Sequence, residues 1–282
     1  MHKIIDFHTH TFPDYVAAKA INKLSISANL KNHLDGREED LIKGNKEALI
    51  GTSIVLPVAT RPGQANDINA GSVKKNKLYN GEGLLYFAAI HPDDINPLIM
   101  LSNIKAAGFL GIKLHPVFQN AYIDEDSYLS IIDAASEIGL ITVIHAGYDI
   151  SYPGVDYVCV KYILNMIEQV HPKNLVLAHM GGWNEWDDVE RYLCGADVYF
   201  DTSFCLTKNE PLDDGKNSMC DVILSNEQFT RIVKKHGADK ILFGSDSPWT
   251  SLEESVRAVK RSGLSNEDID KILFLNAKKL LK

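Results

Sequence analysis

Short apolar runs alternate with longer amphipathic stretches along the whole chain, and this alternation limits the fold more than any other feature of the sequence. Several of the short runs, such as Ile141-Thr142-Val143-Ile144, are almost continuously apolar. Runs of that kind are typical of parallel strands that are covered on both faces. The expected strands are Lys3–His8, Thr52–Leu56, Leu84–Ile90, Phe109–Leu114, Leu140–His145, Asn174–His179, Asp197–Asp201 and Lys240–Ser245.

The stretches between these runs place apolar residues at three- and four-residue spacing, which is typical of amphipathic helices. Gly108 and Gly139 follow the last apolar turn of two of them, as glycines do at helix C-termini. Acidic residues after Ser265 predict the start of a C-terminal helix. The other expected helices are Tyr15–Leu24, Glu38–Leu49, Ala65–Lys77, Pro97–Ala107, Asp124–Ile138, Tyr157–Val170, Glu185–Leu193, Asn226–His236 and Leu252–Ser262.

Strict β-α alternation predicts an α/β fold with a parallel sheet and right-handed crossovers. Eight units favour a closed (β/α)8 TIM barrel, and an open doubly wound sheet is the alternative. The 282 residues suit a single domain, residues 1–282, since such barrels run to about 250 residues. Two long connections, Ser25–Arg37 after the first helix and Thr202–Leu224 after the seventh strand, are expected to act as lids or binding loops.

Composition excludes several classes of function. The formal net charge is −8 and there is no basic run, which argues against binding of nucleic acid or anionic lipid. No apolar stretch is long enough to cross a bilayer, and Asp6 and His8 interrupt the N-terminus before a signal-peptide core could form, so we expect a cytoplasmic protein. The four cysteines form no C-x-x-C pair. A homodimer is a hypothesis that rests only on how often soluble enzymes form symmetric oligomers.

Residues that bind metals follow four of the expected strands. The first strand ends with His8 and His10, and residues two apart on a strand point the same way, with Cα atoms about 6.6 Å apart. His145, His179 and Asp246 follow the fifth, sixth and eighth strands. The carboxyl ends of all barrel strands surround one mouth, so these side chains are predicted to form a metal site there.

Five strings taken together resemble the amidohydrolase superfamily, and the most similar branch is the amidohydrolase-2-type metal-dependent hydrolases. That branch also includes decarboxylases such as aminocarboxymuconate semialdehyde decarboxylase. The resemblance implies a (β/α)8 barrel with zinc or another divalent metal. The strings follow the family's order and are Asp6-Phe7-His8-Thr9-His10, Gly111-Ile112-Lys113-Leu114-His115-Pro116, Ile144-His145-Ala146-Gly147, Ala178-His179-Met180-Gly181-Gly182 and Phe243-Gly244-Ser245-Asp246-Ser247-Pro248-Trp249.

The resemblance also implies roles for individual residues. His8 and His10 match the family's first-strand metal ligands, and His145 matches the fifth-strand ligand. His179 matches a histidine that binds a second metal in binuclear members and orients the reacting water or substrate in mononuclear ones. Asp246 matches an aspartate that is both metal ligand and proton shuttle. One or two ions are expected, and manganese, iron and nickel are alternatives to zinc.

Lys113 and His115 each have two interpretations. Lys113 is similar to the lysine that is carboxylated and bridges two metals in dihydroorotase and urease; otherwise it is an ordinary ammonium that meets a substrate carboxylate or phosphate. His115 is a candidate substrate contact, or it shapes the loop before Pro116. Trp183 and Trp249 could line a substrate pocket, but packing is the more frequent role of tryptophan.

A divalent cation lowers the pKa of bound water to about 7 and polarises a substrate carbonyl. Asp246 is placed to accept the proton of that water and pass it to a leaving group. We therefore predict hydrolysis of a small amide, lactone or ester. The alternatives are a metal-dependent non-oxidative decarboxylase of a small carboxylic acid and a barrel that binds a metal or ligand without turnover. Phosphoesterases of the polymerase-and-histidinol-phosphatase type share the D-x-H-x-H string, but the other strings match their pattern less well.

Overall fold

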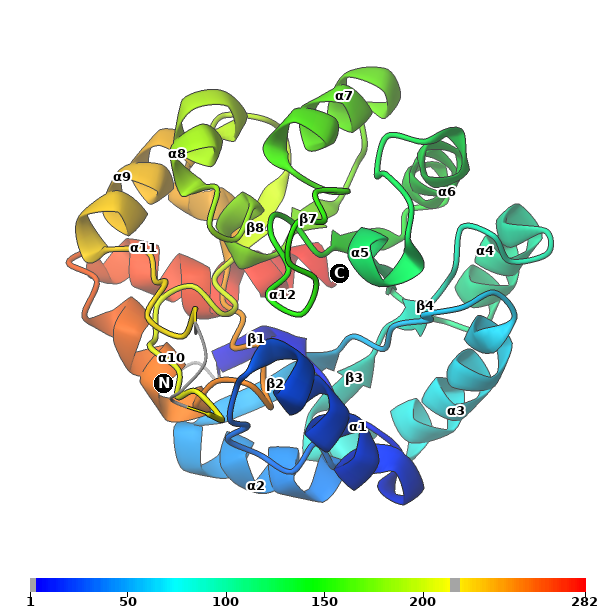
Figure 1. The fold of residues 1–282 in the computed structure, drawn as a ribbon, viewed down its shortest axis with the longest axis horizontal. Helices are drawn as coiled ribbons and strands as arrows, with labels where there is room; N and C mark the ends of the chain where they lie inside the picture. The colour runs from blue at the N-terminus through cyan, green and yellow to red at the C-terminus, as the bar shows by residue number, and fades with distance from the viewer. Residues whose placement is uncertain (1–3, 214–218) are drawn as a thin grey trace.

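A ring of parallel strands surrounds the centre of the molecule and helices lie outside it (Figure 1). The computed structural model describes residues 4–213 and 219–282. Lys3 of the first expected strand, and Asp214 and Gly215 of the second long connection, lie outside the described residues. The strands are β1 (Ile4–Thr9), β2 (Ile50–Val55), β3 (Leu84–Tyr86), β4 (Ala88–Ala89), β5 (Gly111–Leu114), β6 (Ile141–Ile144), β7 (Leu175–Leu177), β8 (Tyr199–Asp201) and β9 (Ile241–Leu242).

Neighbouring strands pair in parallel throughout the ring, in the orders β1-β2-β3 and β4-β5-β6-β7-β8-β9. The two sheets meet at Phe87, where the expected strand Leu84–Ile90 is interrupted and β3 gives way to β4. The ring closes where the Phe7 N–H of β1 donates to the Phe243 carbonyl, just after β9, at 2.7 Å. The predicted (β/α)8 barrel is therefore confirmed, and the open-sheet alternative is wrong.

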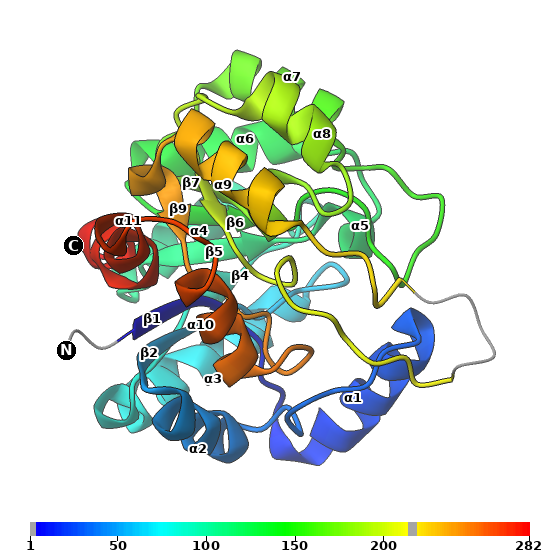
Figure 2. The same ribbon diagram turned by 90° about the vertical axis from the view of Figure 1, so that its left-hand side faces the viewer.

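The expected helices are present, with shifted ends and two differences (Figure 2). The first helix continues to Ala28, so the expected connection Ser25–Arg37 begins inside it; Asn29, with φ of 49°, ends it. The short helix at Pro116 was not predicted, because four residues show no amphipathic period. The helices are α1 (Asp14–Ala28), α2 (Glu38–Ala48), α3 (Gln64–Leu78), α4 (Pro97–Ala106), α5 (Pro116–Gln119), α6 (Asp126–Glu137), α7 (Val160–Val170), α8 (Trp186–Asp188), α9 (Asn226–His236), α10 (Leu252–Lys260), α11 (Asn266–Asp270) and α12 (Asn276–Leu280), with a π-helical turn after α8 and another between α11 and α12.

The two long connections lie side by side at one end of the barrel (Figure 2). The Lys31 N–H donates to the Glu210 carbonyl at 2.9 Å. Asn29 exchanges two hydrogen bonds with the backbone of Asp213. The segment after α1 and the segment after β8 therefore support each other beside the strand ends. None of the described helices is both long and apolar enough to span a membrane.

Candidate metal centre

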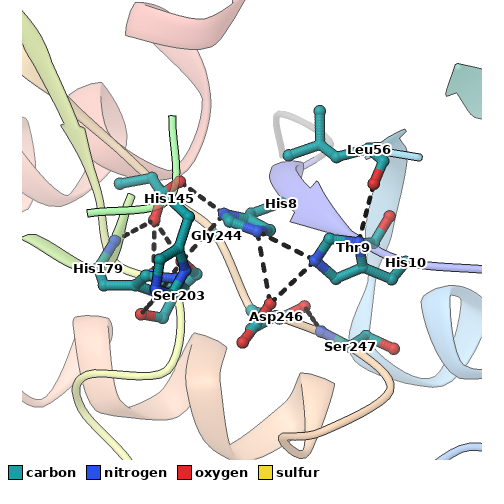
Figure 3. Close-up of polar contacts among 12 residues, drawn as sticks. His8, Thr9, His10, Leu56, His145, His179, Ser203, Gly244, Asp246 and Ser247 are labelled. Atoms are coloured by element: carbon teal, nitrogen blue, oxygen red, sulfur yellow. Dashed lines mark hydrogen bonds and ion pairs between the residues drawn. The ribbon is translucent and has the colours of Figure 1, made fainter. Parts of the chain in front are cut away.

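His8, His10 and Asp246 converge at the carboxyl ends of β1 and β9, and we call these three residues the primary triad (Figure 3). The Nε2 atoms of His8 and His10 are 3.2 Å apart. Oδ1 of Asp246 lies 3.4 Å from His8 Nε2 and 3.3 Å from His10 Nε2. In a tetrahedral site with bonds of about 2.1 Å, neighbouring donor atoms lie about 3.4 Å apart. The spacing of the triad therefore fits a single divalent cation.

The other nitrogen of each imidazole faces an acceptor, which fixes the direction of the lone pairs. His8 Nδ1 is 2.8 Å from Oδ2 of Asp201, and His10 Nδ1 is 2.9 Å from the Leu56 carbonyl. A carboxylate or carbonyl can only accept, so both protons lie on Nδ1 and both Nε2 lone pairs face Asp246. Metal-binding histidines are commonly oriented by such outer contacts. The donor set thus fits a bound metal in its chemistry as well as in its spacing.

The chain after β9 brings Asp246 against β1. The Asp246 N–H donates to the His8 carbonyl at 2.8 Å, and Asp246 has a positive φ of 68°. A side chain at Gly244 would place its Cβ 2.9 Å from the Cβ of His8, so glycine permits this close approach. Asp6 accepts hydrogen bonds from the backbone of His8 and Ser245 and joins the two segments. Burial raises the pKa of Asp6 to about 7.

Charges around the triad are those that a cation site needs. Burial, with a contribution from Lys113, lowers the pKa of His8 to about 4, so its imidazole is neutral at pH 7. Burial alone would raise the pKa of Asp246, but the imidazoles of His10, His8 and His179 around its carboxylate outweigh that effect and hold the pKa well below its usual range. Lys113 is fully buried with its Nζ 3.3 Å from His8 Nε2, and burial lowers its pKa to about 8.

The remaining predicted residues line the same mouth. His179 Nε2 lies 3.0 Å from His145 Nδ1 (Figure 3). The ring of His145 stacks on that of His115 with centroids 4.1 Å apart. Donor atoms of His115, His145 and Asp149 lie within 4.8 Å of one another. The structure therefore brings all seven predicted site residues to one mouth, with the ring of His145 in contact with those of His115 and His179.

Sequence reasoning missed three polar residues of the site. Asp201 accepts a hydrogen bond from His8 Nδ1 and so orients that ring. Both the backbone carbonyl and the hydroxyl of Ser203 lie within hydrogen-bond distance of His179 Nδ1. Asp201 ends the seventh expected strand, so its position was a signal that could have been used. Asp149 lies in the loop after His145, where no strand-end pattern indicates it.

The two tryptophans considered as pocket residues pack instead. Trp183 is buried in the core and donates its Nε1 hydrogen to the Phe204 carbonyl at 3.2 Å. Trp249 is partly buried against the same core. This confirms the packing interpretation.

Solved structures of similar fold cover almost the whole chain. The 2,6-dihydroxybenzoate decarboxylase from Rhizobium matches with a TM-score of 0.71 and 14% identity, over 100% of this chain and 99% of that one. A dihydroxybenzoic acid decarboxylase from Polaromonas sp. JS666, with bound manganese and the inhibitor 2-nitroresorcinol, matches with a TM-score of 0.69 and 14% identity over 100% and 97%. A putative 2-pyrone-4,6-dicarboxylic acid hydrolase from Pseudomonas putida matches with a TM-score of 0.64 and 14% identity over 100% and 98%. At these identities the similarity shows the fold.

Comparison of sequences identifies the family. No curated protein matches the chain. The family model Amidohydro_2, described as Amidohydrolase, matches residues 5–282, which include the primary triad and every other predicted site residue. The chain therefore belongs to the Amidohydro_2 family of amidohydrolases.

Proposed function

We propose that this protein is a metal-dependent enzyme that removes the carboxyl group of a small carboxylic acid without oxidation. The observation that carries the proposal is the primary triad with a fully buried ammonium, that of Lys113, 3.3 Å from one of its donor atoms. A cation and an ammonium that share one buried mouth form a strong site for a carboxylate. From the sequence alone we predicted hydrolysis, with non-oxidative decarboxylation as an alternative; we now prefer decarboxylation.

The comparisons support this order of preference. Two of the structures described above are named decarboxylases of dihydroxybenzoic acids, and one of them holds manganese. Hydrolysis is the second candidate, favoured by the putative pyrone dicarboxylic acid hydrolase among the same neighbours. All three names contain a carboxylic acid, so both candidates share an acidic substrate.

His8, His10 and Asp246 are the residues proposed to hold the ion, since their lone pairs converge at the spacing that a cation requires. Two imidazoles and one carboxylate accept zinc, manganese, iron or nickel. The ion would supply a Lewis acid that draws electron density from an oxygen of the substrate.

Other residues of the chain are proposed to bind the acid and to move the proton. Lys113 is proposed to attract the substrate carboxylate. Burial lowers the pKa of Lys113, and the charges of Asp201 and Asp246 oppose that effect and favour the ammonium form. His115 is proposed to contact the remainder of the substrate. In the reaction the bond between carbon and the carboxyl group breaks, carbon dioxide leaves, and the electron pair stays on carbon and takes a proton. Asp246, whose carboxylate also feels the charge of His179, is the group proposed to pass a proton from solvent water to that carbon.

The test is turnover by the metal-loaded protein of three acids, with carbon dioxide and ring opening measured in parallel. They are 2,6-dihydroxybenzoate, 2-pyrone-4,6-dicarboxylate and 5-carboxyvanillate, the last taken from the name of a further structural neighbour, the 5-carboxyvanillate decarboxylase from Sphingomonas paucimobilis. Release of carbon dioxide that is abolished by Asp246→Asn supports the proposal. Ring opening without carbon dioxide assigns the site to the hydrolase candidate. If the loaded protein turns over none of the three acids and does not bind them, an acidic substrate is the wrong class.

A further inference from the structure

The helix α10 and the segment that follows β8 lie side by side, and we propose that the cavity between them binds a small organic anion (Figure 2). We call this cavity the α10 cavity. It has a volume of about 370 Å³, which lies in the range of small-molecule pockets, about 300 to 1,000 Å³. None of the predicted site residues lines it, so it is separate from the mouth of the barrel. The inference therefore does not depend on the proposed function.

Positive side chains predominate in the lining of the α10 cavity, although the chain as a whole is acidic, with a net charge of −8. Lys208, Arg257 and Arg261 line the cavity. Glu254 is the one carboxylate in its described lining. A concave surface with an excess of positive charge attracts anions. Guanidinium groups also bind phosphate and carboxylate groups through paired N–H donors.

The carboxylate of Glu254 is offset by Arg257 on the same helix. Arg257 Nη1 lies 2.5 Å from Glu254 Oε1, and Arg257 Nη2 lies 2.9 Å from Glu253 Oε2. Both ion pairs join residues about one helical turn apart, so they form within α10 whether or not a ligand is bound. The cations that remain for a ligand are those of Lys208 and Arg261.

Both of these cations are available to a ligand. Arg261 follows α10, is exposed, and forms no ion pair within residues 4–213 and 219–282. Lys208 Nζ lies 2.9 Å from Asp221 Oδ1, but both side chains are more than half exposed. Exposed ion pairs of this kind contribute little to stability. Lys208 can therefore exchange Asp221 for a ligand at little cost.

Much of the remaining lining is apolar. Leu206, Ile223 and Ala258 line the cavity, and each is half-buried. Their exposed apolar surface is in water until a ligand covers it, and covering it is favourable. An inorganic ion would leave that surface in water, whereas a molecule with an apolar body and one anionic group would contact both kinds of lining. The α10 cavity thus favours an organic anion over inorganic phosphate.

The experiment is calorimetric titration of the full-length protein with phenyl phosphate, benzoate and inorganic phosphate. The first two probes carry different anionic groups on an apolar ring, and the third lacks the ring. We expect phenyl phosphate or benzoate to bind with one molecule per chain and more tightly than inorganic phosphate. Arg261→Gln and Lys208→Gln should each weaken that binding about tenfold, since each removes a charge-assisted hydrogen bond. Both residues are exposed, so neither variant should affect folding.

Lys260→Gln is the matched control for these variants. Lys260 is an exposed cation next to Arg261 in the chain, and it does not line the α10 cavity. Its replacement changes the net charge by the same amount as Arg261→Gln. We therefore expect Lys260→Gln to bind the probe as tightly as the unaltered protein.

Other results would overturn the inference. If neither phenyl phosphate nor benzoate binds at millimolar concentration, the cavity is not a site for organic anions. If Arg261→Gln and Lys260→Gln weaken binding equally, general surface charge attracts the probe. If inorganic phosphate binds as tightly as the probes with a ring, the apolar lining contributes nothing and an organic anion is the wrong class. Binding that survives both Arg261→Gln and Lys208→Gln places the probe elsewhere, and its loss in His8→Ala with His10→Ala would identify that place as the mouth.

Discussion

Asp201 is the residue whose replacement gives the most informative prediction for the primary triad. Its Oδ2 receives the Nδ1 hydrogen of His8 at 2.8 Å, and its Oδ1 receives the backbone N–H groups of His179 and Ser203, each at 3.0 Å. It is fully buried, and its contacts with His8, His179 and Ser203 outweigh the effect of burial, so the pKa of Asp201 lies well below its usual range. The side chain therefore holds His8 in the tautomer that binds metal.

Asp201→Asn replaces one carboxylate oxygen, which accepts a hydrogen bond, with an amide nitrogen, which can only donate one. The amide oxygen is expected to keep the two backbone hydrogen bonds, which directs the amide nitrogen at His8 Nδ1. A donor at that position forces the proton of His8 onto Nε2 and removes the lone pair from the triad. Loss of such an outer partner typically weakens metal affinity 10- to 100-fold. That range corresponds to about 1.4 to 2.7 kcal/mol.

The assay is a competition titration of the metal-free protein with zinc against a chelator of known affinity. Asp197→Asn is the control, because Asp197 lies close by in the chain but is exposed and pairs with Lys240 on the surface. We expect Asp201→Asn to bind zinc at least tenfold more weakly than Asp197→Asn. Affinities of the two variants within a factor of two would refute the argument that Asp201 sets the tautomer of His8.

Three further predictions concern the ion, acid stability and one glycine. The double variant His8→Ala with His10→Ala should lose the ion of the primary triad in elemental analysis, and full metal content would place that ion elsewhere. The pKa values of His8 and His236 are lowered by burial to about 4, so between pH 6.5 and 4 the unfolded chain binds protons that the folded one does not. Burial also lowers the pKa values of His115, His145 and His179, and these five imidazoles outnumber the carboxyls of Asp6 and Asp149, whose raised pKa values act in the opposite direction. The metal-free protein should therefore lose stability to urea as the pH falls through that window, and a flat profile would contradict this balance. Gly147→Ala should lower the melting temperature much more than Gly154→Ala, because both glycines have φ near 85° but only at Gly147 would the Cβ meet a backbone atom, at 2.2 Å. Equal losses would show that the positive φ alone sets the cost.

The barrel and the residues at its mouth could be predicted because both follow from patterns along the chain. Apolar runs of strand length identify strands, and a polar residue at the end of such a run must lie at the mouth once the ring closes. His8, His145 and His179 were placed correctly at the mouth by this rule. Asp201 obeys the same rule and was missed only because an aspartate at a strand end often simply meets solvent.

The contacts of the His145 ring could not be predicted, since they depend on side-chain direction and on a loop. The sequence places His145 at a strand end but does not say which neighbours its ring faces. In the structure the ring stacks on His115, and its free nitrogen faces Asp149, four residues farther along an irregular loop. Loop residues carry no periodic signal, so Asp149 has no counterpart in the sequence pattern.

Charge at the mouth links the metal centre to the choice of an acidic substrate. With the imidazole of His8 neutral, the primary triad and its outer partner contribute two carboxylates, Asp246 and Asp201, against the single ammonium of Lys113. The metal-free mouth therefore repels an anion in this region, and a divalent cation reverses the sign of the local charge. A carboxylate should bind only after the ion, so titration of 2,6-dihydroxybenzoate into metal-free and zinc-loaded protein should show binding in the loaded form alone. Equal binding to both forms would mean that Lys113 suffices and that the cation is not what admits the acid.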